Sequence, residues 1–184
     1  MEIKTIGVIG AGTIGPAIAY LVVLHGYKTI LQGVSQELLE DGVAYIRQTL
    51  QDGIAAGTVT LQQEQEALAN LAISRSVEDV CREADLLIDA TQEELEVKLE
   101  IFTLFDKFAR PDAILASSSQ TIPISDLAEI TFRTENCVGL RFRVPVPQAK
   151  SVDIIQTANT ADATVKTCVE VGQRCGLEVA VIRE

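Results

Sequence analysis

The stretch that decides the fold is Ile6-Gly7-Val8-Ile9-Gly10-Ala11-Gly12-Thr13-Ile14-Gly15, near the start of a sequence of 184 residues. Its apolar first part belongs to a run that begins at Ile3 and predicts a buried strand. Three glycines with the spacing GxGxxG follow, and the apolar segment after them predicts a helix that closes at His25 and Gly26. A strand, a glycine-rich turn and a helix therefore succeed one another directly.

The glycine turn has the spacing and the context of a dinucleotide-binding loop. We expect Gly10 to make the turn, Gly12 to let a pyrophosphate approach the backbone, and Gly15 to permit close packing of helix on strand. Thr13 and Ile14 lie at the helix N-terminus, whose free N–H groups and dipole favour phosphate. GxGxxG alone is a weak motif, and the alternative interpretation is a glycine turn without a ligand.

Strands and helices alternate along the whole sequence. We expect strands over residues 3–9, 27–31, 71–74, 85–90, 113–116, 137–142, 152–157 and 177–182. Ser35 and Ser76 are predicted helix N-caps, and Gly53 and Gly57 are predicted to break the helix after Ser35. The helix over about residues 61–70 would complete a helical hairpin that projects from the sheet. The pattern predicts an α/β fold: one Rossmann-type domain over residues 1–184, with a doubly wound, mainly parallel sheet.

The composition excludes several kinds of partner. Hydrophobic residues make up 47% of the chain and aromatic residues 4%, so the core must be aliphatic. The formal net charge of −11 argues against nucleic acid and anionic membrane, because a protein must neutralise the phosphates that it binds. The same charge works weakly against acyl-CoA. No apolar run approaches the ~20 residues of a membrane span.

The cysteines carry no sign of a metal or disulfide framework. Cys81, Cys137, Cys168 and Cys175 show neither a CxxC motif nor a Cys/His metal spacing, so we expect no metal site. The start, Met1 to Lys4, has no targeting character. We therefore expect reduced thiols and a cytoplasmic protein.

An expected acidic residue is missing after the second strand. An Asp or Glu about 20 residues beyond the glycine loop normally binds the adenosine ribose. Gly33 stands at this place, within Leu31-Gln32-Gly33-Val34-Ser35. A small neutral residue could admit a 2′-phosphate, yet no Arg stands beside it in the sequence. We therefore expect weak binding, with little preference between NAD and NADP, and expect Gly33→Asp to shift the preference toward NAD.

Four segments together resemble the N-terminal domain of the L-3-hydroxyacyl-CoA dehydrogenases. They are residues 6–15, residues 88–98, residues 114–119 and the run Gly139-Leu140-Arg141-Phe142-Arg143-Val144-Pro145-Val146-Pro147. Their order and spacing match over essentially the whole chain. The resemblance implies an NAD-binding oxidoreductase of fatty acid metabolism. It also implies that Glu93 and Lys98 lie near the nicotinamide half of the cofactor; an i, i+5 charge pair is the alternative.

The resemblance places the family's catalytic residues at positions that differ in this chain. Arg141 replaces the His that takes the proton from the 3-hydroxyl group as hydride leaves to NAD, and an Arg side chain stays protonated and cannot act as that base. Val144 replaces an Asn, Gln120 the catalytic Ser, and Asp153 the Glu that orients the His. Because the family's His and Glu lie on neighbouring strands, we expect an Arg141–Asp153 ion pair. The sole histidine, His25, is not expected to be catalytic.

Three functions follow from these departures. The first is a catalytically degenerate NAD(P)-binding protein, and the second is an active oxidoreductase on another hydroxy substrate, with Arg141 binding an anionic group. The third is a structural partner that binds no nucleotide. The family continues with a helical domain that closes the acyl-CoA cleft and carries the dimer contact, and the sequence reaches Glu184 where the domains would join. We expect a homo-oligomer or a partner chain that supplies such a domain.

Overall fold

The computed structural model describes residues 2–184, so that Met1, where the predicted domain begins, lies outside the described residues. The strands are β1 (Thr5–Ile9), β2 (Lys28–Gln32), β3 (Leu71–Ser74), β4 (Leu86–Asp89), β5 (Ile114–Ser117), β6 (Cys137–Phe142), β7 (Ser151–Gln156) and β8 (Glu178–Arg183). The helices are α1 (Gly15–Leu24), α2 (Gln36–Ala55), α3 (Leu61–Ala69), α4 (Val77–Glu83), α5 (Leu95–Phe108), α6 (Ile124–Ala128) and α7 (Asp162–Arg174). The alternation predicted from the sequence is confirmed.

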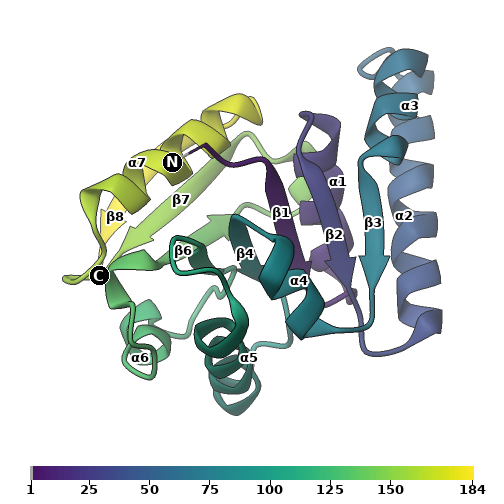
Figure 1. Ribbon diagram of the computed structural model, residues 1–184. Helices are drawn as coiled ribbons and strands as arrows, with labels where there is room; N and C mark the ends of the chain where they lie inside the picture. The colour runs from purple at the N-terminus through teal and green to yellow at the C-terminus, as the bar shows by residue number, and fades with distance from the viewer. Residues whose placement is uncertain (1) are drawn as a thin grey trace.

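The described strands form one sheet in the order β3-β2-β1-β4-β5-β6-β7-β8 (Figure 1). Neighbours from β3 to β6 are parallel, β7 is antiparallel to β6, and β8 is parallel to β7. The chain leaves β1 for β2 on one side and later returns to β4 on the other side. The sheet is therefore doubly wound, as predicted, and its strand order reverses between β1 and β4.

Helices cover both faces of the sheet, because its central strands are apolar on both faces. One core cluster joins α1, α2, α3 and α7 to the sheet, with Ile18, Leu39 and Ile46 among its buried residues. The opposite cluster joins α4, α5 and α6, with Phe102 and Phe105 fully buried. The aliphatic core expected from the composition thus lies in two layers, one on each side of the sheet.

Helix ends follow the polar signals of the sequence, with one exception. The Ser35 and Ser76 hydroxyls accept hydrogen bonds from the N–H groups three residues on, which confirms both predicted caps. The predicted break at Gly53 is wrong, because α2 continues to Ala55. A Cβ at Gly53 would lie 2.6 Å from Val59 Cγ2, so the glycine makes room for the returning chain rather than ending the helix. Figure 1 shows α2 and α3 side by side at the β3 edge, the expected hairpin.

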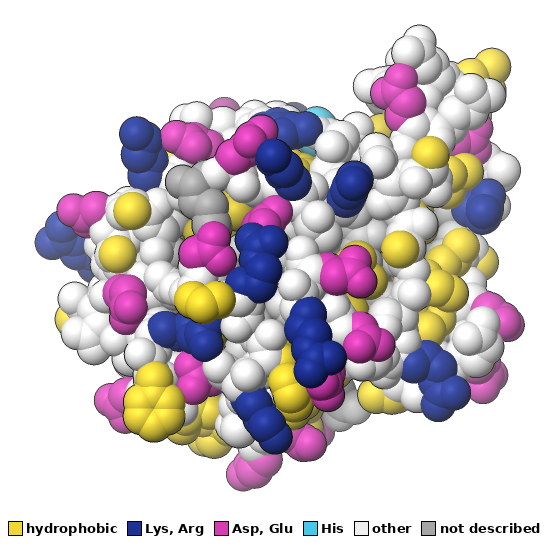
Figure 2. All heavy atoms as spheres, in the orientation of Figure 1, with side chains coloured by type: hydrophobic (Ala, Val, Ile, Leu, Met, Phe, Trp, Pro, Cys, Tyr) yellow, Lys and Arg dark blue, Asp and Glu magenta, His cyan; other side chains and the backbone are white. Residues whose placement is uncertain are grey.

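The surface shown in Figure 2 carries Lys, Arg, Asp and Glu side chains that are interspersed, without a broad patch of one sign. No helix among the described residues is both long and apolar enough to cross a membrane. The four cysteines are buried free thiols, and burial raises the pKa of Cys81 to about 12.

Candidate functional site

A cleft of about 440 Å³ opens where the strand order reverses, at the carboxyl ends of β1 and β4. Its walls come from the glycine loop, from the segment that directly follows β2, and from the loop after β4. The lining residues are Gly10, Ala11, Gly12, Thr13, Ile14, Val34, Leu38, Ala90, Thr91, Gln92, Glu93, Val97 and Ser118. Open α/β sheets bind their ligands at this kind of position.

Each glycine of the loop has a different structural reason to be a glycine. Gly10 adopts φ +108°, which other residues rarely reach, and a Cβ there would lie 2.8 Å from the Ala90 carbonyl oxygen. A Cβ on Gly15 would lie 1.7 Å from the Gly10 carbonyl oxygen, so α1 packs against the turn only without a side chain. A Cβ on Gly12 would meet no atom within 4 Å, because Gly12 faces the open cleft.

The loop and the first turn of α1 offer donors to an anion. Within the described residues, the backbone N–H groups of residues 11–14 donate no hydrogen bond to a protein acceptor. Ile14 is the N-cap of α1, its side chain makes no capping bond, and a proline occupies the first turn, where no N–H is needed. The positive end of the helix dipole is therefore uncovered and fits the phosphates of a dinucleotide.

At the end of β2, where an acidic residue would be expected to bind an adenosine ribose, Gly33 stands instead. Gly33 is buried, and a Cβ there would lie 2.9 Å from the Ala11 Cβ and 3.0 Å from Leu39 Cγ. A cation does lie at this edge: Arg75 directly follows Ser74, which pairs with Gln32 across β2 and β3. Arg75 is far from Gly33 along the chain and becomes its neighbour only across the parallel strands β2 and β3, so the sequence pattern does not indicate it.

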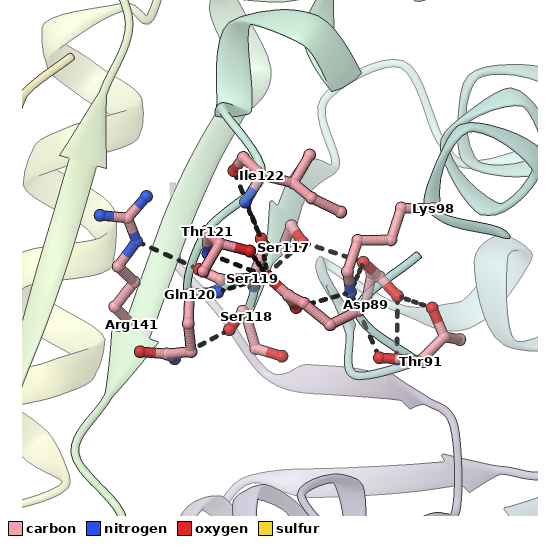
Figure 3. A network of polar contacts seen from close by, with 11 residues as sticks. Asp89, Thr91, Lys98, Ser117, Ser118, Ser119, Gln120, Thr121, Ile122 and Arg141 are labelled. Carbon is pink, nitrogen blue, oxygen red and sulfur yellow. Dashed lines mark hydrogen bonds and ion pairs between the residues drawn. The ribbon is translucent and has the colours of Figure 1, made fainter. Parts of the chain in front are cut away.

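On the other side of the cleft, a buried ion pair organises the loop after β4. Lys98 Nζ lies 2.9 Å from Asp89 Oδ2, and the two side chains are 1% and 0% exposed. Asp89 also accepts hydrogen bonds from the Ser117 hydroxyl and from the backbone and hydroxyl of Thr91. Figure 3 shows Lys98 reaching across to Asp89, with Ser117 beside it. Asp89, absent from the predicted site, was recognisable as an acid that ends a buried strand.

Glu93, predicted near the nicotinamide, holds the loop that follows β5. Its Oε1 accepts hydrogen bonds from the Ser119 hydroxyl at 2.6 Å and from Gln120 and Thr121 N–H at 2.9 Å. Partial burial raises the pKa of Glu93, but these bonds and the Lys98 charge outweigh it and lower the pKa to about 2. Lys98 Nζ lies 3.9 Å from Glu93 Oε2, so Asp89 rather than Glu93 is its principal partner.

The predicted Arg141–Asp153 ion pair is wrong, although the two residues pair in register across β6 and β7. Asp153 Oδ2 instead lies 3.2 Å from the guanidinium of Arg143, which directly follows the last residue of β6. Arg141 Nε donates to the Ser119 carbonyl oxygen at 3.1 Å, as Figure 3 shows. A long side chain reaches a diagonal neighbour across antiparallel strands, so Arg143 can take the carboxylate while Arg141 turns to the β5 loop.

The other positions of the family's catalytic residues hold no acid–base group. Gln120 donates from Nε2 to the Ser118 carbonyl oxygen, and Val144 is 72% exposed. His25 Nδ1 lies 2.8 Å from the Leu21 carbonyl oxygen, at the C-terminus of α1 and thus at the opposite edge of the sheet from the cleft. Burial raises the pKa of Glu184. Hydrogen bonds from Ser125 and Ile124, together with the charge of Arg141, outweigh burial and lower this pKa.

The fold and the glycine loop define the class: an α/β dinucleotide-binding domain. The family model described as 3-hydroxyacyl-CoA dehydrogenase, NAD binding domain, matches residues 5–184. The chain belongs to this family. The resemblance drawn from the sequence motifs is thereby confirmed.

The relatives are longer than this chain. A 3-hydroxybutyryl-CoA dehydrogenase of Bradyrhizobium diazoefficiens is 35% identical over 179 residues, which cover 97% of this chain and 61% of the relative. The human mitochondrial hydroxyacyl-coenzyme A dehydrogenase is 29% identical over 95% of this chain and 57% of its own length. The crystal structure of (S)-3-hydroxybutyryl-CoA dehydrogenase from Ralstonia eutropha superposes with a TM-score of 0.96 at 28% identity, covering 100% of this chain and 64% of that one. The chain spans about three fifths of these proteins.

Proposed function

We propose that this domain binds a nicotinamide dinucleotide but does not supply the acid–base residues of a 3-hydroxyacyl-CoA dehydrogenase. The observation that carries the binding is the row of unpartnered N–H groups, residues 11–14, at the head of α1 and on the wall of the 440 Å³ cleft. Gly10, Gly12, Thr13, Ile14 and Gly15 would hold the phosphates. Glu93 and Lys98 support the loop on the opposite wall.

The absence of acid–base chemistry rests on what replaces the base. Arg141 holds a permanent positive charge and is fixed to the Ser119 carbonyl oxygen. Among the cleft-lining residues, Glu93 is the sole titratable group, and with a pKa of about 2 it stays ionised far below neutral pH. A positioned general base contributes about 10²–10⁴-fold in rate, and the structure offers no substitute for it on these walls.

The longer relatives bear on the substrate. An acyl-CoA cleft needs walls beyond this domain, and we propose that a helical domain or a partner chain would complete it. With Arg141 in place of the base, the alternative is an oxidoreductase for a different hydroxy substrate, in which the guanidinium binds an anionic group. The two functions differ in turnover, not in dinucleotide binding.

NADH fluorescence titration tests the binding with a matched pair of glycine variants. Gly12→Ala adds a methyl group that meets no protein atom, so the melting temperature should stay unchanged while NADH affinity falls about tenfold, ~1.4 kcal/mol. Gly15→Ala places its methyl group against the Gly10 carbonyl oxygen and should lower the melting temperature itself. Unchanged NADH affinity in Gly12→Ala would contradict the proposed site.

Turnover tests the second half of the proposal. We expect the 184-residue chain to reduce NAD at background rate with (S)-3-hydroxybutyryl-CoA. Oxidation of this substrate with a rate governed by a pKa near 7 would overturn the proposal. Turnover confined to other, anionic hydroxy substrates, and abolished in Arg141→Ala, would support the alternative instead.

A further inference from the structure

The packing at the end of β2 leaves no space for the acidic residue that reads an adenosine ribose. The Ala11 Cβ lies 2.9 Å from where a Gly33 Cβ would stand, and Leu39, 1% exposed, lies at 3.0 Å. An Asp at this position would require both neighbours to move. The missing carboxylate is thus part of how the glycine loop and α2 fit together.

Arg75 lies at the same edge of the sheet as Gly33. Leu31 pairs with Ile73 and Gln32 with Ser74, and the Gly33 N–H donates to the Ser74 carbonyl oxygen at 3.1 Å. Paired residues of parallel strands share a face, and faces alternate along each strand. Arg75, next after Ser74, therefore falls at the register position of Gly33, on the face where α2 begins.

Arg75 has a fixed backbone and an uncommitted side chain. Gln32 Nε2 donates to the Arg75 carbonyl oxygen at 3.3 Å, which ties the two strand ends together. Within residues 2–184, the Arg75 guanidinium takes part in no ion pair or hydrogen bond, and the residue is exposed. The neighbouring Glu78 is paired with Arg82 instead.

We propose that Arg75 binds the 2′-phosphate of NADP(H), so that this domain prefers NADP(H) to NAD(H); the inference rests on the dinucleotide site proposed above. A ribose 2′-hydroxyl calls for a carboxylate, whereas a 2′-phosphate calls for a guanidinium and is repelled by an acid. The Gly33 position supplies no acid, and Arg75 supplies the guanidinium. The N-terminus of α2, a helix of 20 residues capped by Ser35, adds a favourable dipole beside them.

Titration with NADPH and with NADH separates this inference from the proposed function. The wild-type chain should bind NADPH more tightly than NADH. Arg75→Ala should weaken NADPH binding about ten- to hundredfold, the value of a charge-assisted hydrogen bond, and leave NADH binding unchanged. Arg47→Ala is the matched control, because Arg47 is also exposed but lies three turns along α2 from its start. It should change neither affinity by more than about twofold.

A second pair of variants tests the role of Gly33 without relying on Arg75. Ala11→Gly removes the nearer of the two groups that crowd the site, so that only Leu39 must shift when Ala11→Gly with Gly33→Asp installs the acid. The double variant should bind NADH more tightly than NADPH, whereas Ala11→Gly alone should keep the wild-type order. NADPH binding no tighter than NADH binding, or an equal loss of both in Arg75→Ala, would overturn the inference and leave the dinucleotide site standing. Binding of neither dinucleotide would overturn the proposed function itself.

Discussion

The buried Asp89–Lys98 pair gives the sharpest test of what holds the cleft together. Asp89→Asn leaves the Lys98 ammonium with the Thr91 carbonyl oxygen at 3.3 Å and the Glu93 carboxylate at 3.9 Å. Lys98→Met leaves Asp89 without its ammonium partner, although Asp89 still accepts bonds from Ser117 and Thr91. Removing one member of a buried pair costs about 3–5 kcal/mol. Because partial partners remain in each case, we expect each variant to lose about 3 kcal/mol.

The double variant Asp89→Asn with Lys98→Met should cost less than either single variant. It leaves no unpaired charge in the core; Asn has the shape of Asp, and Met keeps all of the Lys side-chain length except its terminal atom. Replacing a whole buried ion pair by neutral groups is often neutral or stabilising by about 1–4 kcal/mol. For a domain of this size, a loss of 3 kcal/mol corresponds to a melting temperature about 6–12 °C lower.

Urea unfolding followed by circular dichroism measures the free energies of all four proteins in this cycle. The coupling between the two positions should reach at least about 3 kcal/mol. Single variants that each lose under about 1 kcal/mol would refute the reasoning, and so would a double variant whose loss equals the sum of the single losses. Either result would mean that the pair is hydrated or interchangeable with Glu93.

Two further predictions concern exposed groups of the site. Glu93 has a pKa lowered from 4.5 to about 2, so its contribution to stability is fully present above about pH 4.5 and disappears as pH falls toward 2. Glu93→Gln should therefore flatten the dependence of the unfolding free energy on pH within that window. Superimposable pH profiles of the wild type and the variant would contradict this. The Arg143–Asp153 pair joins a side chain that is 66% exposed to one that is 16% exposed, so Arg143→Ala should cost less than about 1 kcal/mol by urea unfolding. A loss of several kcal/mol would show that the pair holds β6 against β7.

The fold could be predicted because its signals are local and redundant. The apolar run before Gly10, the caps at Ser35 and Ser76, and the glycine spacing all point to the same alternation of strand and helix. The break predicted at Gly53 failed because a glycine in a helix can serve packing against a distant residue, here Val59. Nothing in the sequence around Gly53 distinguishes the two uses.

The side-chain contacts of the site were less predictable, because they form between neighbouring strands that are far apart in the sequence. Arg141 lies on β6 and Arg143 directly after its end, and either could reach Asp153. The choice depends on the Ser119 carbonyl oxygen, which becomes a neighbour of Arg141 only once β5 and β6 are paired. The alternative interpretation of Glu93 and Lys98 pairs these residues, five apart in the sequence, whereas the fold brings Asp89 closer to Lys98. Sequence spacing indicates several possible partners for each charged side chain, and the order of the strands in the sheet determines which partner it contacts.

The two halves of the site depend on different parts of the sheet. The glycine loop and the Asp89–Lys98 pair belong to β1, β4, β5 and α5, in the buried parallel centre. Arg141 lies on β6 and Asp153 on β7, where the sheet turns antiparallel. Arg141 contacts the Ser119 carbonyl oxygen and does not line the cleft, so a substitution of Arg141 should leave the cleft walls and their backbone N–H groups intact. The replacements at Arg141 and Asp153 are therefore compatible with the intact cleft at the centre of the sheet. NADH binding and turnover measured in Arg141→His separate the two parts. NADH affinity should stay unchanged, and turnover should remain at background because Asp153 is still held by Arg143.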